Sequence, residues 1–320
     1  MATAPAIDDR RTAAVESVAT WRRTDRIALG LCWAAGLLLC ALAVAIVAYM
    51  AYQGLRFLQP ELLWTRPLAD SDQSRSGGFL DPLIGTLGLI VIGSMIAVPL
   101  GIVTAVWLTE FGRPSWLART VESGIEVIAG TPSIVLAIFG LLLFQQDLFA
   151  WMSFTAQGNA VFGRSFLTAG AMMSLIALPY VQGSTREALQ AVPRHVREAS
   201  YALGKTKAAT IRRVLLPAAR PGIATGTVLG MARIAGDTAI VVILLGASLQ
   251  LQRVEGPPLV GDLRGTGSTL TSYVYNNSPA GEGNASQKAY AAAFVLLLTV
   301  IALNFTIDFL ARRRRTPWTR

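Results

Sequence analysis

Residues 27–50 read IALGLCWAAGLLLCALAVAIVAYM, a run of 24 residues without one charged side chain. A helix of about 20 residues is long enough to cross the roughly 30 Å of hydrocarbon in a bilayer. This run therefore predicts a transmembrane helix. A secretory signal peptide is the alternative, but 26 mostly polar residues precede the run, and it is longer than the apolar core of a signal peptide. We expect the helix to be retained.

The composition of the chain points the same way. Hydrophobic residues make up 53% of its 320 residues and charged residues 15%, against about 25% charged in ordinary globular proteins. These values exclude a disordered chain, a coiled coil and almost any soluble enzyme. A single histidine, His195, argues against a histidine-based metal site or a Ser-His-Asp triad, and the only cysteines, Cys32 and Cys40, share one apolar run. The chain is predicted to be an all-α integral membrane protein.

Six apolar runs are long enough to predict spans, so both termini are expected on the same side of the membrane. The runs cover residues 27–50, 83–109, 127–144, 165–185, 221–250 and 289–311. Pro99 predicts a kink in the second span, and Gly130-Thr131-Pro132 breaks the third near its start. The predicted organisation is an N-terminal segment (1–26), a first helix (27–50), a core (78–311) with a long internal connection (186–220), and a basic tail (312–320).

Basic residues are distributed unevenly between the two sides of the predicted membrane. With both termini inside, 20 of the 28 basic residues fall on the inner side, 7 on the outer side and one, Arg233, within a span. Cytoplasmic segments carry such an excess, so the bias predicts cytoplasmic termini in a bacterial plasma membrane. We expect the arginine run 312–315 to contact membrane lipids, and we expect no nucleic-acid partner.

The connection between the fourth and fifth predicted spans, residues 186–220, is too long for a simple loop. Within it, residues 199–206 (ASYALGKT) match a relaxed phosphate-binding loop. Such a loop needs a buried strand before it and a nucleotide-binding sheet around it. The residues that precede it, 193–198 (PRHVRE), do not form the pattern of a buried strand, so we do not expect this chain to bind a nucleotide.

A more specific pattern occupies the same connection. Glu198-Ala199-Ser200, three residues, Gly204, nine residues and Val214–Pro217 resemble the EAA motif of ABC importer permeases. In that family the motif forms two short cytoplasmic helices joined at the glycine, which insert into a groove of the ATPase subunit. Glycine suits the sharp turn between them. The resemblance implies an ATPase-coupling role for Glu198, Ala199, Ser200, Gly204, Val214, Leu216 and Pro217.

Further stretches between about residues 78 and 311 resemble the PstA family of phosphate permease subunits. They are Gly85-Thr86-Leu87, Gly130–Val135, Leu178-Pro179, Glu187–Pro193 and Ala232–Ala239. The resemblance implies a six-helix fold of the type I ABC importer permeases. It also implies an ABC ATPase dimer, a sister permease of the PstC kind and an extracytoplasmic phosphate-binding protein as partners. This chain would then bind no cofactor itself, and the ATPase would use ATP.

Two positions depart from the pattern of that family. Gly183 stands where an arginine is usual, and Arg186, three positions later, could reach a similar face of the helix. Asp237 replaces the usual glutamate, and Ile240 replaces the proline that follows it. Phosphate is the leading predicted substrate, and another oxyanion such as sulfate or molybdate is the alternative. An ion-coupled secondary transporter and a signalling or scaffold subunit are the other classes considered.

Arg233 and Asp237 place opposite charges within the fifth predicted span. A charge at the centre of a span costs about 2.5–3.5 kcal/mol, and residues four apart on a helix can form an ion pair. On a helical wheel the pair shares an arc of about 80° with Gly222, Gly226 and Gly230, a spacing that lets a second helix approach closely. Two interpretations remain open: a structural salt bridge, and a role in transport or gating, for which a guanidinium suits an oxyanion.

Overall fold

The computed structural model describes residues 23–67, 77–112, 115–153, 163–246, 250–251, 262–279 and 285–313, and within these ranges the protein is helical. An isolated antiparallel bridge joins Pro67 and Gly77. The long helices are α1 (Arg23–Phe57), α2 (Leu80–Val106), α5 (Phe166–Gln190), α8 (Leu216–Gly236) and α11 (Ser286–Arg313). Shorter helices are α3 (Trp116–Gly130), α4 (Ser133–Phe144), α6 (Arg194–Ala202), α7 (Lys207–Thr210) and α10 (Leu270–Asn277). Single π-helical turns are η3 (Trp107–Phe111), η5 (Ile211–Leu215) and η6 (Val241–Leu245).

The chain forms two compact units, Met1–Tyr52 and Gln53–Arg320. The described part of the first unit belongs to helix α1, which contains the first predicted span. A continuous helix satisfies its own backbone hydrogen bonds, as hydrocarbon requires. Most of the predicted N-terminal segment and the basic tail from residue 314 lie outside the described residues.

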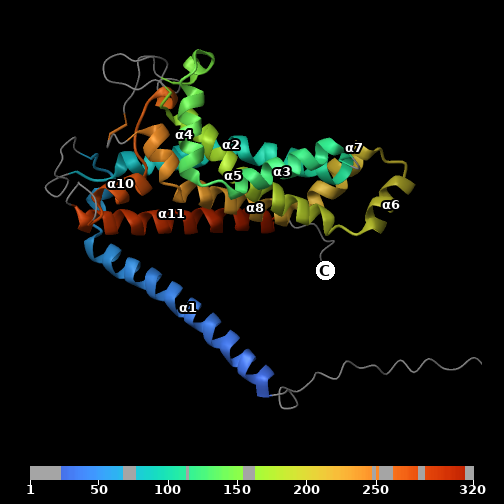
Figure 1. The fold of residues 1–320 in the computed structure, drawn as a ribbon, viewed down its shortest axis with the longest axis horizontal. Coiled ribbons are helices and arrows are strands. Elements are labelled where there is room, and N and C mark those ends of the chain that lie inside the picture. The colour runs from blue at the N-terminus through green and yellow to red at the C-terminus, as the bar shows by residue number, and fades with distance from the viewer. Residues whose placement is uncertain are drawn as a thin grey trace, which may run out of the picture. The chain divides into compact units, whose positions relative to one another are not determined.

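The second unit is a helix bundle. Helices α2, α5, α8 and α11 run along one another in it (Figure 1). The main apolar core lies where α2, α5 and α8 meet, and its buried members include Leu89, Met173, Ala177 and Ile234. Helices α6 and α7 lie at one end of the bundle and α10 at the opposite end (Figure 1).

Glycine allows α8 to approach α5 closely. A Cβ atom added at Gly222 would overlap the Cβ of Ala188 on α5. One added at Gly226 would lie 3.1 Å from the Cα of Val181, and one at Gly230 would lie 3.2 Å from its Cγ2. Such contacts are tighter than ordinary side-chain packing permits. These three glycines therefore form part of the surface on which α8 meets α5.

The predicted count of six spans is not confirmed within the described residues. Four helices are long and apolar enough to cross a membrane: α1, α2 together with η3, α5, and residues Ser286–Ile307 of α11. The pair α3 and α4 meets the same criteria as a bent fifth span. The count of six is therefore not established within the described ranges.

Two of the predicted spans are interrupted in the structure. The break predicted at Gly130-Thr131-Pro132 is present, because the chain bends by 110° between α3 and α4, where Thr131 is extended and Pro132 has no N–H to donate. The prediction of one continuous span over 221–250, by contrast, is wrong. Helix α8 ends at Gly236, and Asp237 is extended (ψ 127°) before a short helical stretch that ends with η6.

We predict that Gly222→Ala destabilises the bundle by about 1–3 kcal/mol, because the added methyl group meets the rigid Cβ of Ala188. Thermal unfolding of the purified protein in detergent measures the effect. Gly183→Ala is the matched control, since nothing lies within 4 Å of a Cβ at this helical glycine. It should leave stability unchanged or raise it by at most about 1 kcal/mol. Equal destabilisation by both substitutions would contradict the packing assigned to Gly222.

Candidate functional site

The α6–α7 segment (residues 194–217) folds as two short helical pieces joined by a turn. Helix α6 ends at Ala202, and the turn passes through Gly204, whose φ of +73° lies in the left-handed region that favours glycine. The hydroxyl of Thr206 then accepts a hydrogen bond of 3.3 Å from the Ala209 N–H and begins α7. The second piece continues through η5 into α8.

The inner side of the turn is held by a hydrogen bond between two hydroxyl groups. Ser200 and Thr210 are both buried, and their hydroxyl oxygens are 2.9 Å apart. Glu198 and Ala199, by contrast, are exposed. Residues Arg194–Ala202 form helix α6, and not the strand that precedes a phosphate-binding loop.

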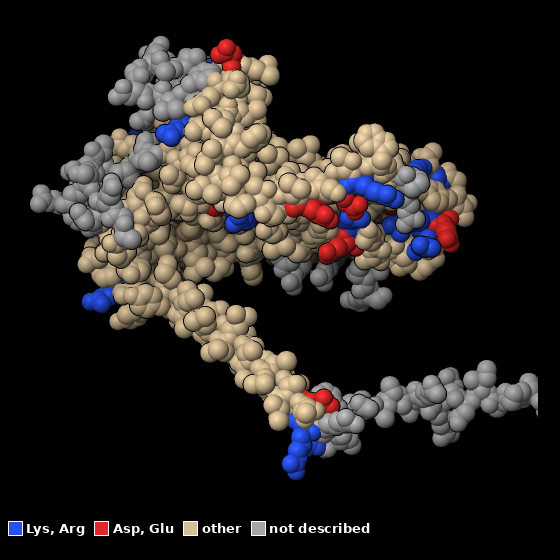
Figure 2. All heavy atoms as spheres, in the orientation of Figure 1, with Lys and Arg blue, Asp and Glu red and all other residues tan. Residues whose placement is uncertain are grey.

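The outer side of the turn is an exposed apolar tip. Leu203 is 78% exposed and Tyr201 42% exposed, and the neighbouring Ala202 and Gly204 are exposed as well. Figure 2 shows charged side chains gathered around this end of the bundle, whereas the middle of the bundle is mostly uncharged. An apolar surface with a polar surround is typical of a protein–protein contact.

The remaining residues of the motif join the segment to the bundle. Val214, Leu216 and Pro217 are half-buried, and Pro217 lies in the first turn of α8, where the missing N–H of proline is tolerated. The neighbouring Leu215, which the motif leaves variable, is fully buried. It belongs to an apolar cluster with Ala105, Leu189, Val192, Ile211 and Ala219.

Arg197 fastens α6 to the bundle. Its guanidinium donates hydrogen bonds to the carbonyl oxygens of Leu189 (2.7 Å) and Val192 (2.8 Å), and its Nε lies 3.4 Å from a carboxylate oxygen of Glu110 in η3. A cation is favourable beside the C-terminal carbonyl groups of α5. Sequence analysis missed both Arg197 and Glu110. The sequence did offer a signal for Glu110, because it is an acidic residue that directly follows the long apolar run 83–109.

Lys207 connects α7 to the same turn. Its Nζ donates a hydrogen bond to the carbonyl oxygen of Glu110 and lies 4.1 Å from the centroid of the Phe111 ring. Such a cation–π contact adds to the hydrogen bond. Both helical pieces of the α6–α7 segment therefore contact η3.

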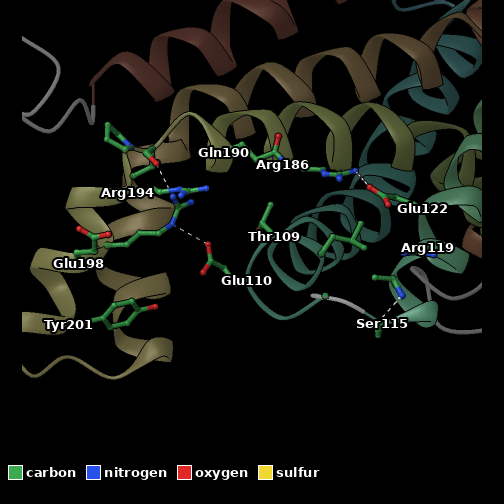
Figure 3. A pocket seen from close by; sticks show the side chains of 16 residues that line it. Thr109, Glu110, Ser115, Arg119, Glu122, Arg186, Gln190, Arg194, Glu198 and Tyr201 are labelled. Carbon is green, nitrogen blue, oxygen red and sulfur yellow. Dashed lines mark hydrogen bonds and ion pairs between the residues drawn. The ribbon is translucent and has the colours of Figure 1, made fainter.

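A cavity of about 920 Å³ lies between α6, η3, α3 and the end of α5 (Figure 3). Glu110 and Arg197 line it, and so does Arg186, which forms an ion pair with Glu122 of α3. In Figure 3 the Arg186–Glu122 pair and the Glu110 carboxylate lie at separate places along the wall. Two ion pairs thus link the elements around this space.

Arg233 and Asp237 form an ion pair of 3.6 Å where α8 ends. The Asp237 side chain is 2% exposed and that of Arg233 is 41% exposed. Asp237 Oδ1 also accepts a hydrogen bond of 3.0 Å from the Ile240 N–H, and Thr271 donates to the Asp237 carbonyl oxygen at 3.4 Å. Asp237 therefore satisfies backbone groups that the break in the helix would otherwise leave unpaired.

The structure keeps Arg186 apart from this pair. Ser184 on α5 donates a hydrogen bond of 2.8 Å to the Gly222 carbonyl oxygen. Arg186 follows Ser184 by two residues, so it lies near Gly222 along the axis of the bundle. Arg233 lies 11 residues further along α8, which corresponds to about 16 Å. Arg186 and Arg233 therefore belong to different regions of the bundle.

Comparison with known proteins identifies relatives of this chain. Residues 97–316 match the family model described as "Binding-protein-dependent transport system inner membrane component". The "Phosphate transport system permease protein PstA 1" of Mycobacterium tuberculosis (strain ATCC 25618 / H37Rv) is 34% identical over 79% of this chain and 78% of its own. The "Phosphate transport system permease protein PstC" of Pasteurella multocida (strain Pm70) is 32% identical over 55% of this chain and 59% of its own.

A solved structure shares the fold. A chain of a bacterial ABC transporter involved in the import of the acidic polysaccharide alginate superposes with a TM-score of 0.61 at 15% identity. The match covers 92% of this chain and 99% of that one. At this identity the likeness concerns the fold alone, which is that of an ABC importer permease.

We predict that Asp237→Asn and Asp237→Ala separate the two contacts of the Asp237 carboxylate. The asparagine keeps an acceptor for the Ile240 N–H, whereas the alanine removes this helix cap at a cost of about 0.5–2 kcal/mol. Arg233 is partly exposed and can be solvated when its partner is neutral. Thermal unfolding in detergent should therefore show a larger loss for Asp237→Ala than for Asp237→Asn. Equal losses would mean that the ion pair, and not the cap, stabilises the break.

Proposed function

The chain belongs to the family of binding-protein-dependent transport system inner membrane components, and we propose that it is the permease subunit of an ATP-driven phosphate importer. Membership makes it a multi-pass inner-membrane subunit of an ABC importer. The finer proposal adds an ABC ATPase dimer, a sister permease and an extracytoplasmic phosphate-binding protein as partners. Both termini would lie in the cytoplasm, where the basic segments face anionic lipids.

The geometry of the α6–α7 segment carries this proposal. Leu203 forms an exposed apolar tip outside the bundle, and the partly exposed Tyr201 lies between this tip and the cavity that it lines. Ser200 and Arg197 hold the inner side of the same segment. A segment that docks on a moving partner subunit needs one exposed face for the partner and another face that is firmly attached to its own bundle. Glu198, Ala199, Ser200, Gly204, Val214, Leu216 and Pro217 would make up this coupling element.

Transport would follow from movement of that element. Helix α6 follows α5 closely along the chain, and α7 continues into α8. Closure of the ATPase dimer would displace the tip, and the displacement would reach the break at Asp237 through α8. Arg233 and Asp237 would act at this break as transport or gating residues, because the partly exposed Arg233 guanidinium can attract an oxyanion.

Other residues would have supporting roles. Arg186 would act on the cavity side, paired with Glu122, and Gly222, Gly226 and Gly230 would keep α8 against α5. We propose that the chain binds no cofactor and carries out no bond chemistry, and that ATP binds to the partner ATPase. Phosphate is the proposed substrate because relatives named as phosphate permeases match most of the chain.

A reconstituted importer tests the proposal directly. The chain, its sister permease, the ATPase and the binding protein are placed in liposomes, and ATP-dependent uptake of radiolabelled phosphate is compared with uptake of sulfate and molybdate. Preferential phosphate uptake is the expected result. Preferential uptake of sulfate or molybdate would show that phosphate is the wrong substrate. The absence of any ATP-driven uptake would reject the proposed function as a whole.

We predict that Leu203→Asp abolishes capture of the ATPase, since it places a charge in the apolar tip, while Leu203→Met preserves it. Gly204→Val should also weaken capture, because a left-handed backbone costs a residue with a side chain about 1–2 kcal/mol. Co-purification of the ATPase from detergent-solubilised membranes measures both effects. Wild-type capture by Leu203→Asp would contradict the docking assignment.

The cytoplasmic location of the α6–α7 segment is tested with Ala208→Cys. This cysteine should be protected from an impermeant thiol reagent that is added outside intact cells.

A further inference from the structure

We propose that Glu110 is a positioning residue that transmits the movement of the α6–α7 segment to helix α2. The proposal rests on the function proposed above and names a second route from the coupling element into the bundle. The first route is the continuous chain from α7 into α8. The second runs through side chains only.

The attachment of α6 to the bundle depends on few contacts. Its inner face carries Val196, which packs against the apolar cluster around Leu215, then Arg197 and Ser200. Next to these contacts the cavity of about 920 Å³ separates α6 from α3, so there is no continuous apolar interface between them. Displacement of α6 is therefore transmitted largely by the side chains that cross to other helices, above all Arg197.

Glu110 is the point at which contacts from both helical pieces meet. Its carboxylate pairs with Arg197 of α6, and its carbonyl oxygen accepts a hydrogen bond from Lys207 of α7. The next residue, Phe111, holds the ammonium group of Lys207 over its ring. The Glu110 side chain is only 9% exposed, so water competes little for the ion pair. A shift of either piece consequently acts on η3, the continuation of α2.

Helix α2 leads from this point to the charged pair. A Cβ at Gly101 would lie 2.9 Å from the Cβ of Val181 on α5, and one at Gly93 would lie 2.8 Å from Cδ1 of Ile234 on α8. Ile234 directly follows Arg233. The absence of a side chain at these two glycines thus lets α2 lie directly against α5 and α8, and such close packing passes displacement from one helix to the next, because packed interiors yield little. The route therefore runs from Arg197 through Glu110 and Gly93 to the break beside Arg233.

The exposed tip is not part of this route, so docking and transmission can be measured separately. The variant Glu110→Gln removes the charge of the carboxylate and keeps its shape and backbone carbonyl. In the complete importer in liposomes it should capture the ATPase as the wild type does. Stimulation of ATP hydrolysis by the phosphate-loaded binding protein should fall by about fivefold or more, and so should phosphate transported per ATP. Glu126→Gln, an exposed glutamate of α3 outside the cavity lining, is the control and should change neither.

Wild-type stimulation and wild-type transport per ATP in Glu110→Gln would overturn the proposal. If this variant fails to assemble because Arg197 is left unpaired, the double variant Glu110→Gln with Arg197→Gln removes the stranded charge. An assembled but uncoupled double variant supports transmission, whereas an assembled and coupled one, or one that still fails to assemble, overturns it. Failure of the proposed function would appear differently, as a wild-type complex that takes up no phosphate.

Discussion

The close packing of α8 on α5 is the constraint on which the rest of this structure depends. Gly222 brings α8 against Ala188 at a distance that no side chain would allow, and Gly226 and Gly230 bring it against Val181 more closely than most side chains approach. The α6–α7 segment begins just after α5 and ends in α8, so this packing fixes both of its ends. A short segment with fixed ends can present one defined tip, which a loop between loosely packed helices could not do.

The same packing explains where polar groups are tolerated. On the far side of Gly230, α8 stops at Gly236, and Asp237 turns its carboxylate toward the Ile240 N–H and the Arg233 guanidinium. An interrupted helix in an apolar environment needs such compensation, because water is not available to the freed backbone groups. The charged pair thus stabilises the local structure whether or not it also contacts an anion. Variants that remove one contact of the Asp237 carboxylate and keep the other are therefore needed to distinguish its roles.

At the other end of the bundle polar contacts have a different purpose. Arg197, Glu110 and Lys207 connect helices that do not follow one another in the sequence. Two of them, Arg197 and Glu110, line a cavity that apolar packing leaves open. Directional contacts of this kind position the α6–α7 segment without covering its surface. An apolar tip and a charged attachment can therefore exist within one short segment.

The sequence by itself determined the membrane class, the long helices and the motif of the α6–α7 segment. Apolar length decides whether a helix can span a bilayer, and the turn at Gly204 follows from the conformational freedom of glycine. Only the tertiary structure decided that the run 221–250 is broken at Asp237 and how sharply the chain bends within 127–144. It also decided that Arg186 pairs with Glu122 and not with the charged pair of α8, and that Glu110 joins Arg197. The periodicity and hydropathy of a sequence predict whether each residue of a helix faces an apolar or an aqueous environment. Where a helix breaks and which distant side chains meet depend on neighbouring helices, whose positions are set by packing between residues far apart in the chain.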